Sequence, residues 1–504
     1  MGEEWIPPAD LRAAVVEAAS RGDTQAAAEL VNRHWDRYAT AETAHLLAAL
    51  RALPGEAFLD NAGLVVAAEY LQHLVQGGEP HRFAANRLAI SGARDSGPLE
   101  ERLILLTSAA ASSRTTGDYR ESVEAATEAR RIVTRATAAE VASISSQLPH
   151  LFLQWGRALE VADDVGLDIQ FEYEEAYRLA LASEQKQIAR RAAAHLAWYT
   201  ARRGWLTAAE KWLHRARTTG VPTPRYEAVA HLAAALIHLD RRKPVESALE
   251  LARMSAYPIG EYWSAALWVR SWHASTPAER ALLEAEIDAE RDRHPNAVSL
   301  GGSHRLDLRA AWLRLGRPAE PAPPNRPGDH TLGASFEYLR GNFRAAIEAA
   351  EPATRPTSPP RARAVALVIS AGAALGLKRR SVAAHHFDIA RALIENEQLY
   401  SAYDHITSDH LHQLIDGTPP VQFPIGRASP DGISPLLATL TNREREVLRL
   451  LPSGRTIPDI ATELFVSPNT VKATLRRLYT KLNVTSRGAA ADIAERAQLG
   501  TQTR

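Results

Sequence analysis

The hydrophobic positions of this chain recur every three to four residues over most of its length. No run between residues 10 and 415 alternates apolar and polar positions in the way a half-buried strand does. A spacing of three and four residues places apolar side chains along one face of a helix. The pattern therefore predicts an all-α fold.

Turns of similar composition separate the predicted helices. Four of them contain a glycine that is followed five residues later by alanine or serine: Gly22, Gly117, Gly204 and Gly341. Two turns without glycine keep the period, because Ala209 maps to Ala248, 39 residues on, and Ala346 to Ala384, 38 residues on. Helix pairs that repeat at about 35 to 40 residues stack into solenoids. A helical-repeat superhelix is the prediction, and a non-repeating helical bundle is the alternative.

Residues 440 to 499 carry strong helix start signals. Thr441 begins a capping box, and Thr456 can cap a second helix that has Pro458 in its first turn. Ser467 repeats the start signal before a third helix expected from about 468 to 482. The apolar positions of that helix form a narrow stripe that should face the core: Val471, Leu475, Leu478 and Leu482.

The opposite side of the third helix is basic, with one small residue at its centre. It carries Asn469, Lys472, Ala473, Arg476, Arg477 and Thr480. In a DNA major groove, Lys and Arg bond to guanine, Asn pairs with adenine, and an Ala methyl meets thymine. Residues 441 to 504 hold eleven Lys/Arg against six Asp/Glu, a difference of +5, while the whole chain balances at 59 against 59. We predict a DNA-reading helix-turn-helix; the alternative is a surface module whose charges are solvated.

These residues closely resemble the C-terminal DNA-binding domain of LuxR-type regulators. The matching pieces are Leu440-Thr441, Arg443 to Leu448, Ile460-Ala461, Val466-Ser467, Thr470 to Lys472, Lys481-Leu482 and Ser486-Arg487. The resemblance implies base-edge roles for Lys472, Ala473 and Arg476. It implies phosphate roles for Thr470, Arg477 and Lys481. It also implies dimers on inverted half-sites, with a fourth helix from about 485 to 498 that contributes the dimer contact through Ala489, Ile493 and Ala497.

Three positions depart from the family pattern. Ile457-Pro458 stand where the family commonly has Asn-Lys, Thr474 where His is frequent, and Asn483 where Gly is frequent. The first departure removes polar groups that can touch DNA near the second helix. The third is tolerable, because Asn accepts the left-handed conformation more readily than most residues.

The N-terminal region resembles degenerate tetratricopeptide-like repeats of the kind found in MalT-like members of the LuxR class. Those proteins usually carry an ATPase module before the repeats, whereas no G-x-x-x-x-G-K-[ST] phosphate loop is present here. We therefore expect no ATP-dependent switching and no cofactor.

Eight of the ten tryptophans lie between residues 155 and 312. Aromatic-rich concave surfaces often bind ligands, but tryptophan also fills the space between helices. Two interpretations stay open: most of these rings are core, or two or three of them line a groove for an effector. The second interpretation singles out Tyr262, Trp263 and Trp268.

Proline-rich segments suggest the domain boundaries. We expect a helical-repeat region over 1–416, a linker rich in proline and glycine over 417–438, and the helix-turn-helix domain over 439–504. Residues 317–329 should interrupt the helical region.

Composition and missing motifs narrow the function. Cysteine is absent, which excludes disulfides and thiolate zinc sites. The chain begins without a secretory leader and has no membrane-length apolar run, so we expect a cytoplasmic protein. No hydrolase or metalloprotease motif occurs, and we expect no enzyme activity. Histidines 405, 410 and 412 are interpreted as surface residues rather than metal ligands.

The sequence as a whole predicts a bacterial sequence-specific transcriptional regulator, expected to be an activator. The helical region would receive a small-molecule or protein signal, and the homodimer would bind promoter DNA and act on RNA polymerase. One alternative is a protein-interaction scaffold with weak or vestigial DNA binding, and another is an unrecognised helical enzyme.

Overall fold

The computed structural model describes most of the chain. The described residues are 6–54, 64, 67–68, 71–72, 75, 98–162, 168–222, 226–295, 302–317, 327–415, 440, 442–452, 455–464, 466–482 and 487–496. These residues form α-helices and short 3-10 turns, and no strand occurs among them. The all-α prediction is confirmed.

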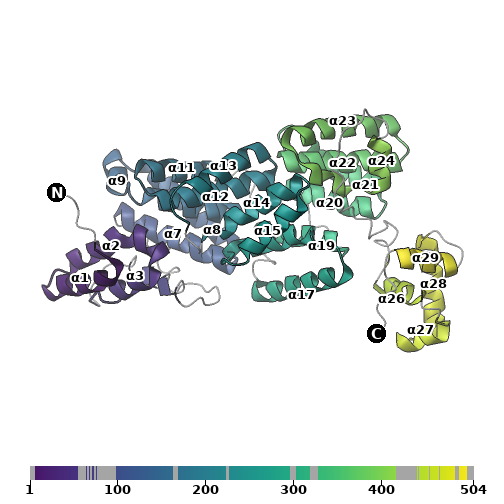
Figure 1. The fold of residues 1–504 in the computed structure, drawn as a ribbon, viewed down its shortest axis with the longest axis horizontal. Helices are drawn as coiled ribbons and strands as arrows, with labels where there is room; N and C mark the ends of the chain where they lie inside the picture. The colour runs from purple at the N-terminus through teal and green to yellow at the C-terminus, as the bar shows by residue number, and fades with distance from the viewer. Residues whose placement is uncertain are drawn as a thin grey trace.

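Within each described range, the helices of the N-terminal region follow one another with short connections (Figure 1). They are α1 (Pro8–Ser20), α2 (Thr24–Ala41), α3 (Thr43–Leu50), α7 (Leu99–Thr116), α8 (Tyr119–Arg135), α9 (Ala138–Ser143), α10 (Leu148–Ala162), α11 (Ile169–Ala182), α12 (Lys186–Arg203), α13 (Leu206–Thr218), α14 (Ala228–Asp240), α15 (Pro244–Met254), η2 (Gly260–Tyr262), α16 (Trp263–Ser271), α17 (Pro277–Arg293), α19 (Gly302–Leu315), α20 (Pro327–Leu339), α21 (Phe343–Ala350), η3 (Glu351–Thr354), α22 (Pro360–Gly376), α23 (Arg380–Glu397), η4 (Tyr400–His405) and α24 (Ser408–Ile415).

Antiparallel hairpins are the building unit of this region. α7 packs against α8, α10 against α11, α12 against α13, α14 against α15, and α22 against α23. The first helices of successive hairpins also pack on one another, as α12 does on α14. Figure 1 shows these hairpins side by side along the molecule. The arrangement fits a stacked helical array, while its classification as tetratricopeptide-like stays a prediction.

The hairpin turns explain the repeat seen in the sequence. Gly117 and Gly204 have φ of +82° and +93°, a left-handed conformation that glycine adopts without strain. In two turns without glycine, Arg242 and Lys378 take this role, each with φ of +59°. The fifth residue after each such turn is small and buried between the paired helices: Ser122, Ala209, Ser247 and Ala383.

The register expected for the two turns without glycine was wrong by one residue. Ala248 and Ala384 are exposed, and their predecessors Ser247 and Ala383 are the buried residues. The cause is that the left-handed residue, rather than the spacing from an earlier repeat, fixes where the second helix begins. Glycine marks that residue in a sequence, but Arg242 does not.

The C-terminal domain has its own hydrophobic core. It consists of α26 (Asn442–Leu450), α27 (Ile457–Glu463), α28 (Pro468–Leu482) and α29 (Arg487–Arg496). α28 packs against α26 and α27, and α29 packs against α26. Figure 1 shows these four helices as a separate body at the C-terminal end. Among the described helices, none combines the length and apolar character required to cross a bilayer.

Candidate nucleic-acid interface

Helix α28 begins where the start signals indicate. Ser467 Oγ accepts a hydrogen bond from the Thr470 amide at 3.1 Å, and Pro468 is the first helical residue, where it loses no intrahelical bond. The preceding helix α27 has a full capping box between Thr456 and Asp459, with Pro458 in its first turn. Both predicted starts are confirmed. Thr441, expected to cap α26, lies outside the described residues.

One face of α28 is fixed in the domain core. Its apolar stripe is buried in the core that α28 forms with α26 and α27: Val471, Leu475, Leu478 and Leu482. Each of these side chains keeps at most 5% of its surface exposed. Because α26 and α27 hold this face, the opposite face has a defined direction relative to the domain.

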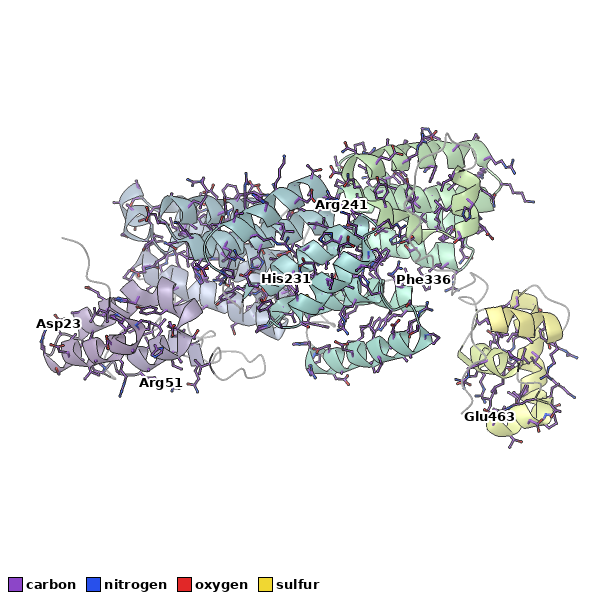
Figure 2. All side chains as sticks on the ribbon, in the orientation of Figure 1. Asp23, Arg51, His231, Arg241, Phe336 and Glu463 are labelled. Atoms are coloured by element: carbon purple, nitrogen blue, oxygen red, sulfur yellow. The ribbon has the colours of Figure 1, made fainter. Side chains whose placement is uncertain are left out.

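The opposite face of α28 is open to solvent. The exposed residues of this basic face are Asn469, Thr470, Lys472, Ala473, Arg476, Arg477 and Thr480. The sticks of Figure 2 show side chains projecting outward from this domain, in which Glu463 is labelled. An exposed helical face with two arginines, a lysine, an asparagine and a methyl group matches the donor and methyl chemistry that a major groove offers.

Lys481 differs from the other predicted contact residues. Its Nζ lies 2.7 Å from Glu444 Oε2, and that carboxylate is almost completely buried. Lys481 therefore anchors α28 to α26, a role that the resemblance did not suggest. Glu444 stands 37 residues before Lys481, so the sequence around either residue gives no local signal for this ion pair.

Two further arginines hold the domain together. Arg443 on α26 donates to the carbonyl oxygen of Leu464 at 2.6 Å, which satisfies the C-terminal end of α27. Arg487 at the start of α29 donates to the carbonyl oxygen of Arg455, just before α27. Part of the positive charge of the domain is thus structural rather than free for DNA.

Two departures from the family pattern have structural explanations. Thr474 is buried, and its hydroxyl donates to the Thr470 carbonyl oxygen at 2.8 Å. This residue is therefore not part of the exposed basic face. Ile457 packs against the domain core, next to the exposed Pro458. Asn483 lies outside the described residues.

Two of the residues expected at a dimer contact, Ala489 and Ile493, belong to α29. Ala497 and the side chains of Ala489 and Ile493 lie outside the described part of the chain. On the same helix, Ala490 and Ala494 are fully buried in the domain core.

Of the two interpretations of the aromatic residues, core packing agrees with where the structure places Tyr262, Trp263 and Trp268. Tyr262 and Trp263 are buried, and Trp268 packs against the main hydrophobic core. The Tyr262 hydroxyl donates to Glu160 Oε2 at 2.7 Å, and Trp263 is stacked between the rings of His294 and His304. Neither side chain lines an open surface, because α16 and its neighbours cover both.

Of the three histidines predicted to lie on the surface near the end of the helical region, only His412 is fully exposed. His405 and His410 are partly buried, and burial lowers the pKa of both. The His410 ring bonds to the Tyr338 hydroxyl at 2.7 Å. In the part of the chain that the structure describes, no group of three or more His, Asp or Glu residues is arranged to hold a metal ion.

Comparison with known proteins identifies the C-terminal domain. Residues 438–494 match the family of bacterial regulatory proteins described as the luxR family. The C-terminal domain belongs to the LuxR family. This LuxR domain is a DNA-binding helix-turn-helix, and the resemblance found in the sequence is confirmed for it.

Similar proteins match this chain over short stretches. The transcriptional regulatory protein NarL of Mycobacterium tuberculosis is 48% identical over 66 residues, 13% of this chain and 31% of NarL. The virulence-factor transcription regulator BvgA of Bordetella pertussis is 44% identical over 66 residues, 13% of this chain and 32% of BvgA. The HTH-type transcriptional regulator Mb0914c of Mycobacterium bovis is 47% identical over 58 residues, 12% of this chain and 7% of that protein. The chain thus spans at most about a third of these relatives, and no solved structure matches it.

Proposed function

We propose that this protein is a bacterial transcriptional regulator that binds promoter DNA through its LuxR domain. The observation that carries the proposal is the basic face of α28, which is exposed while the other face of the helix is buried in the domain core. A recognition helix needs this combination, because base contacts require an exposed polar face in a fixed orientation.

The contacts to DNA divide into two kinds. Lys472, Ala473 and Arg476, with Asn469 beside them, would meet base edges and set the sequence preference. Thr470 and Arg477 would meet phosphates and supply affinity that depends on salt. Lys481 would also contact a phosphate, but its ammonium would then bond to the phosphate and to Glu444 at the same time.

Regulation would arise in the N-terminal region. We propose the division of the chain into a helical region over 1–416, a linker over 417–438 and the LuxR domain over 439–504. A small molecule or protein that prefers one arrangement of the helical region would change how the two LuxR domains of a homodimer are presented to DNA. We further propose that the protein activates transcription through RNA polymerase and has no enzyme activity of its own.

Enrichment of genomic DNA tests this function. The purified full-length protein is mixed with sheared DNA of its own genome, and the bound fragments are sequenced. We expect a few promoters with inverted repeats to be enriched. The variant Lys472→Ala/Arg476→Ala should lose them, while Arg449→Ala, an exposed arginine on α26, should keep them.

The same experiment separates regulator from scaffold. A scaffold with vestigial DNA binding would give the same fragment profile for the wild type and for Lys472→Ala/Arg476→Ala. The outcome that contradicts the proposal is therefore an absence of enriched sequences that depend on these two side chains.

A further inference from the structure

Arg314 on α19 lies against Trp272, at the C-terminal end of α16. The guanidinium carbon is 3.4 Å from the indole ring centroid. Both Arg314 Nε and Trp272 Nε1 are shielded from solvent, and no described residue accepts a hydrogen bond from either atom. Buried donors without acceptors are rare in folded proteins, because their desolvation is not repaid. The stacked geometry brings these two N–H donors into one small volume.

The charges around Arg314 do not supply the missing acceptor. Asp404 is the nearest carboxylate in electrostatic terms, but both of its oxygens are bound by Arg242. Arg280 adds a further positive charge that acts on Arg314. Among the described residues, the charged neighbours that act on the Arg314 guanidinium are thus two cations, Arg242 and Arg280, and one carboxylate that is already paired, Asp404.

The neighbouring groups on the other side are neutral or paired. His405 lies edge-on to Trp272, with ring centroids 6.1 Å apart, and burial together with Arg314 and Arg361 lowers its pKa to about 3. Arg361 is itself bound to both oxygens of Asp240. The cluster contains two carboxylates, those of Asp404 and Asp240. It contains four guanidinium groups, those of Arg314, Arg242, Arg280 and Arg361.

Burial has the expected effect on an arginine without an anion. Loss of hydration lowers the pKa of Arg314 to about 10. A bound anion would reverse this, because opposite charge favours the protonated guanidinium. Arg314, Arg242 and His405 each keep part of their surface exposed, so the cluster borders solvent.

The cluster also lies where two helical blocks meet. Arg242 follows α14, whereas its partner Asp404 belongs to η4. Arg361, at the start of α22, donates to the carbonyl oxygen of Arg202 at the end of α12. Figure 1 shows the block α20–α24 beside α14 and α19. A ligand held here would touch elements of both blocks.

We propose that Arg314 and Trp272 form a binding site for an oxyanion, either a carboxylate or a phosphate group of a small molecule. An oxyanion accepts hydrogen bonds from several donors at once, and planar guanidinium groups match its geometry. Arg280 contributes positive charge nearby. Identification of this oxyanion with the effector rests on the proposed function; its binding does not.

Anion binding by the full-length protein, without DNA, tests the site. Sodium phosphate and sodium acetate are titrated calorimetrically against sodium chloride at equal ionic strength. We expect saturable binding of at least one oxyanion. Arg314→Gln should weaken it about ten- to hundredfold, as for the loss of a charged hydrogen-bond partner. The control Arg291→Gln should bind like the wild type, because its guanidinium also stacks on a tryptophan, Trp312, at 4.7 Å but pairs with Asp288.

A second variant keeps the test independent of folding. Trp272→Phe preserves a ring beneath Arg314 but removes the N–H donor, so it should also weaken oxyanion binding. Binding of phosphate alone or of acetate alone supports the site and assigns the oxyanion class. Binding no stronger than that of chloride, or equal binding by wild type, Arg314→Gln and Trp272→Phe, would overturn the proposal. Because no DNA is present, failure of the proposed function leaves this result unaffected.

Discussion

Lys481 Nζ lies 2.7 Å from Glu444 Oε2, which joins the end of α28 to the first turn of α26. The carboxylate keeps 5% of its surface exposed and the lysine side chain 34%. A pair of this kind orients the helix that carries the basic face, because α26 is itself packed in the domain core. The link between stability and DNA binding in this domain can be tested at this pair.

Glu444→Gln should loosen α28 without touching the basic face. The substitution removes the anion that neutralises Lys481, and we expect a loss of about 1–2 kcal/mol of domain stability. Hydrogen exchange of the α28 amides in the full-length protein measures it. Glu446→Gln is the matched control, because Glu446 forms an exposed pair with Arg443. Equal exchange rates in the two variants would show that the buried pair does not hold α28.

Gly204 should be far less tolerant of substitution than Gly341. Both have positive φ, +93° and +77°, so alanine adds about 1 kcal/mol of backbone strain at either position. At Gly204 a Cβ would also lie 2.5 Å from the backbone nitrogen of Arg361, whereas at Gly341 it would meet nothing within 4 Å. We expect Gly204→Ala to cost about 1–3 kcal/mol more in thermal unfolding. Similar losses for both variants would contradict the close approach of α22 to this turn.

Glu160 should make the helical region less stable as the pH rises toward 7. Burial raises the pKa of its carboxyl to about 7, although Tyr173 and Tyr262 both donate hydrogen bonds to it. Since the folded-state pKa lies above the unfolded value, the folded state holds the extra proton. Its contribution is therefore complete below about pH 4.5 and is lost as the pH rises through about 7.

Comparison of the wild type with Glu160→Gln isolates this effect. The amide keeps an acceptor for the two tyrosines but does not titrate. Between pH 5 and 8 the wild type should lose up to about 3 kcal/mol relative to the variant, measured by denaturant unfolding at each pH. Burial lowers the pKa of histidines such as His195, so these residues make the protein more stable as the pH rises. Their contribution is present in both the wild type and the variant. Parallel pH profiles would refute the raised pKa.

Local signals predicted the LuxR domain better than the helical region. Helix α28 has the predicted bounds, because Ser467 and Pro468 define its start within the sequence itself. The contact of Lys481 with Glu444, 37 residues away, left no local signal. In the helical region, Tyr262 and Trp263 could not be assigned to core or groove, because their burial depends on helices distant in the chain. Arg242 likewise takes a left-handed turn position that only glycine would have marked.

The measurement that tests the central claim most directly is the salt dependence of binding to an enriched promoter fragment. Fluorescence anisotropy compares the wild type with Lys472→Ala, Arg476→Ala, Arg477→Ala and the control Arg449→Ala. We expect Lys472→Ala and Arg476→Ala each to cost about 1–3 kcal/mol on the specific fragment and to reduce its preference over unrelated DNA. Arg477→Ala should weaken both DNAs alike and lower the salt slope by about 1. Arg449→Ala should bind like the wild type. If all four variants bind the specific fragment as the wild type does, the basic face of α28 is not the DNA-reading surface.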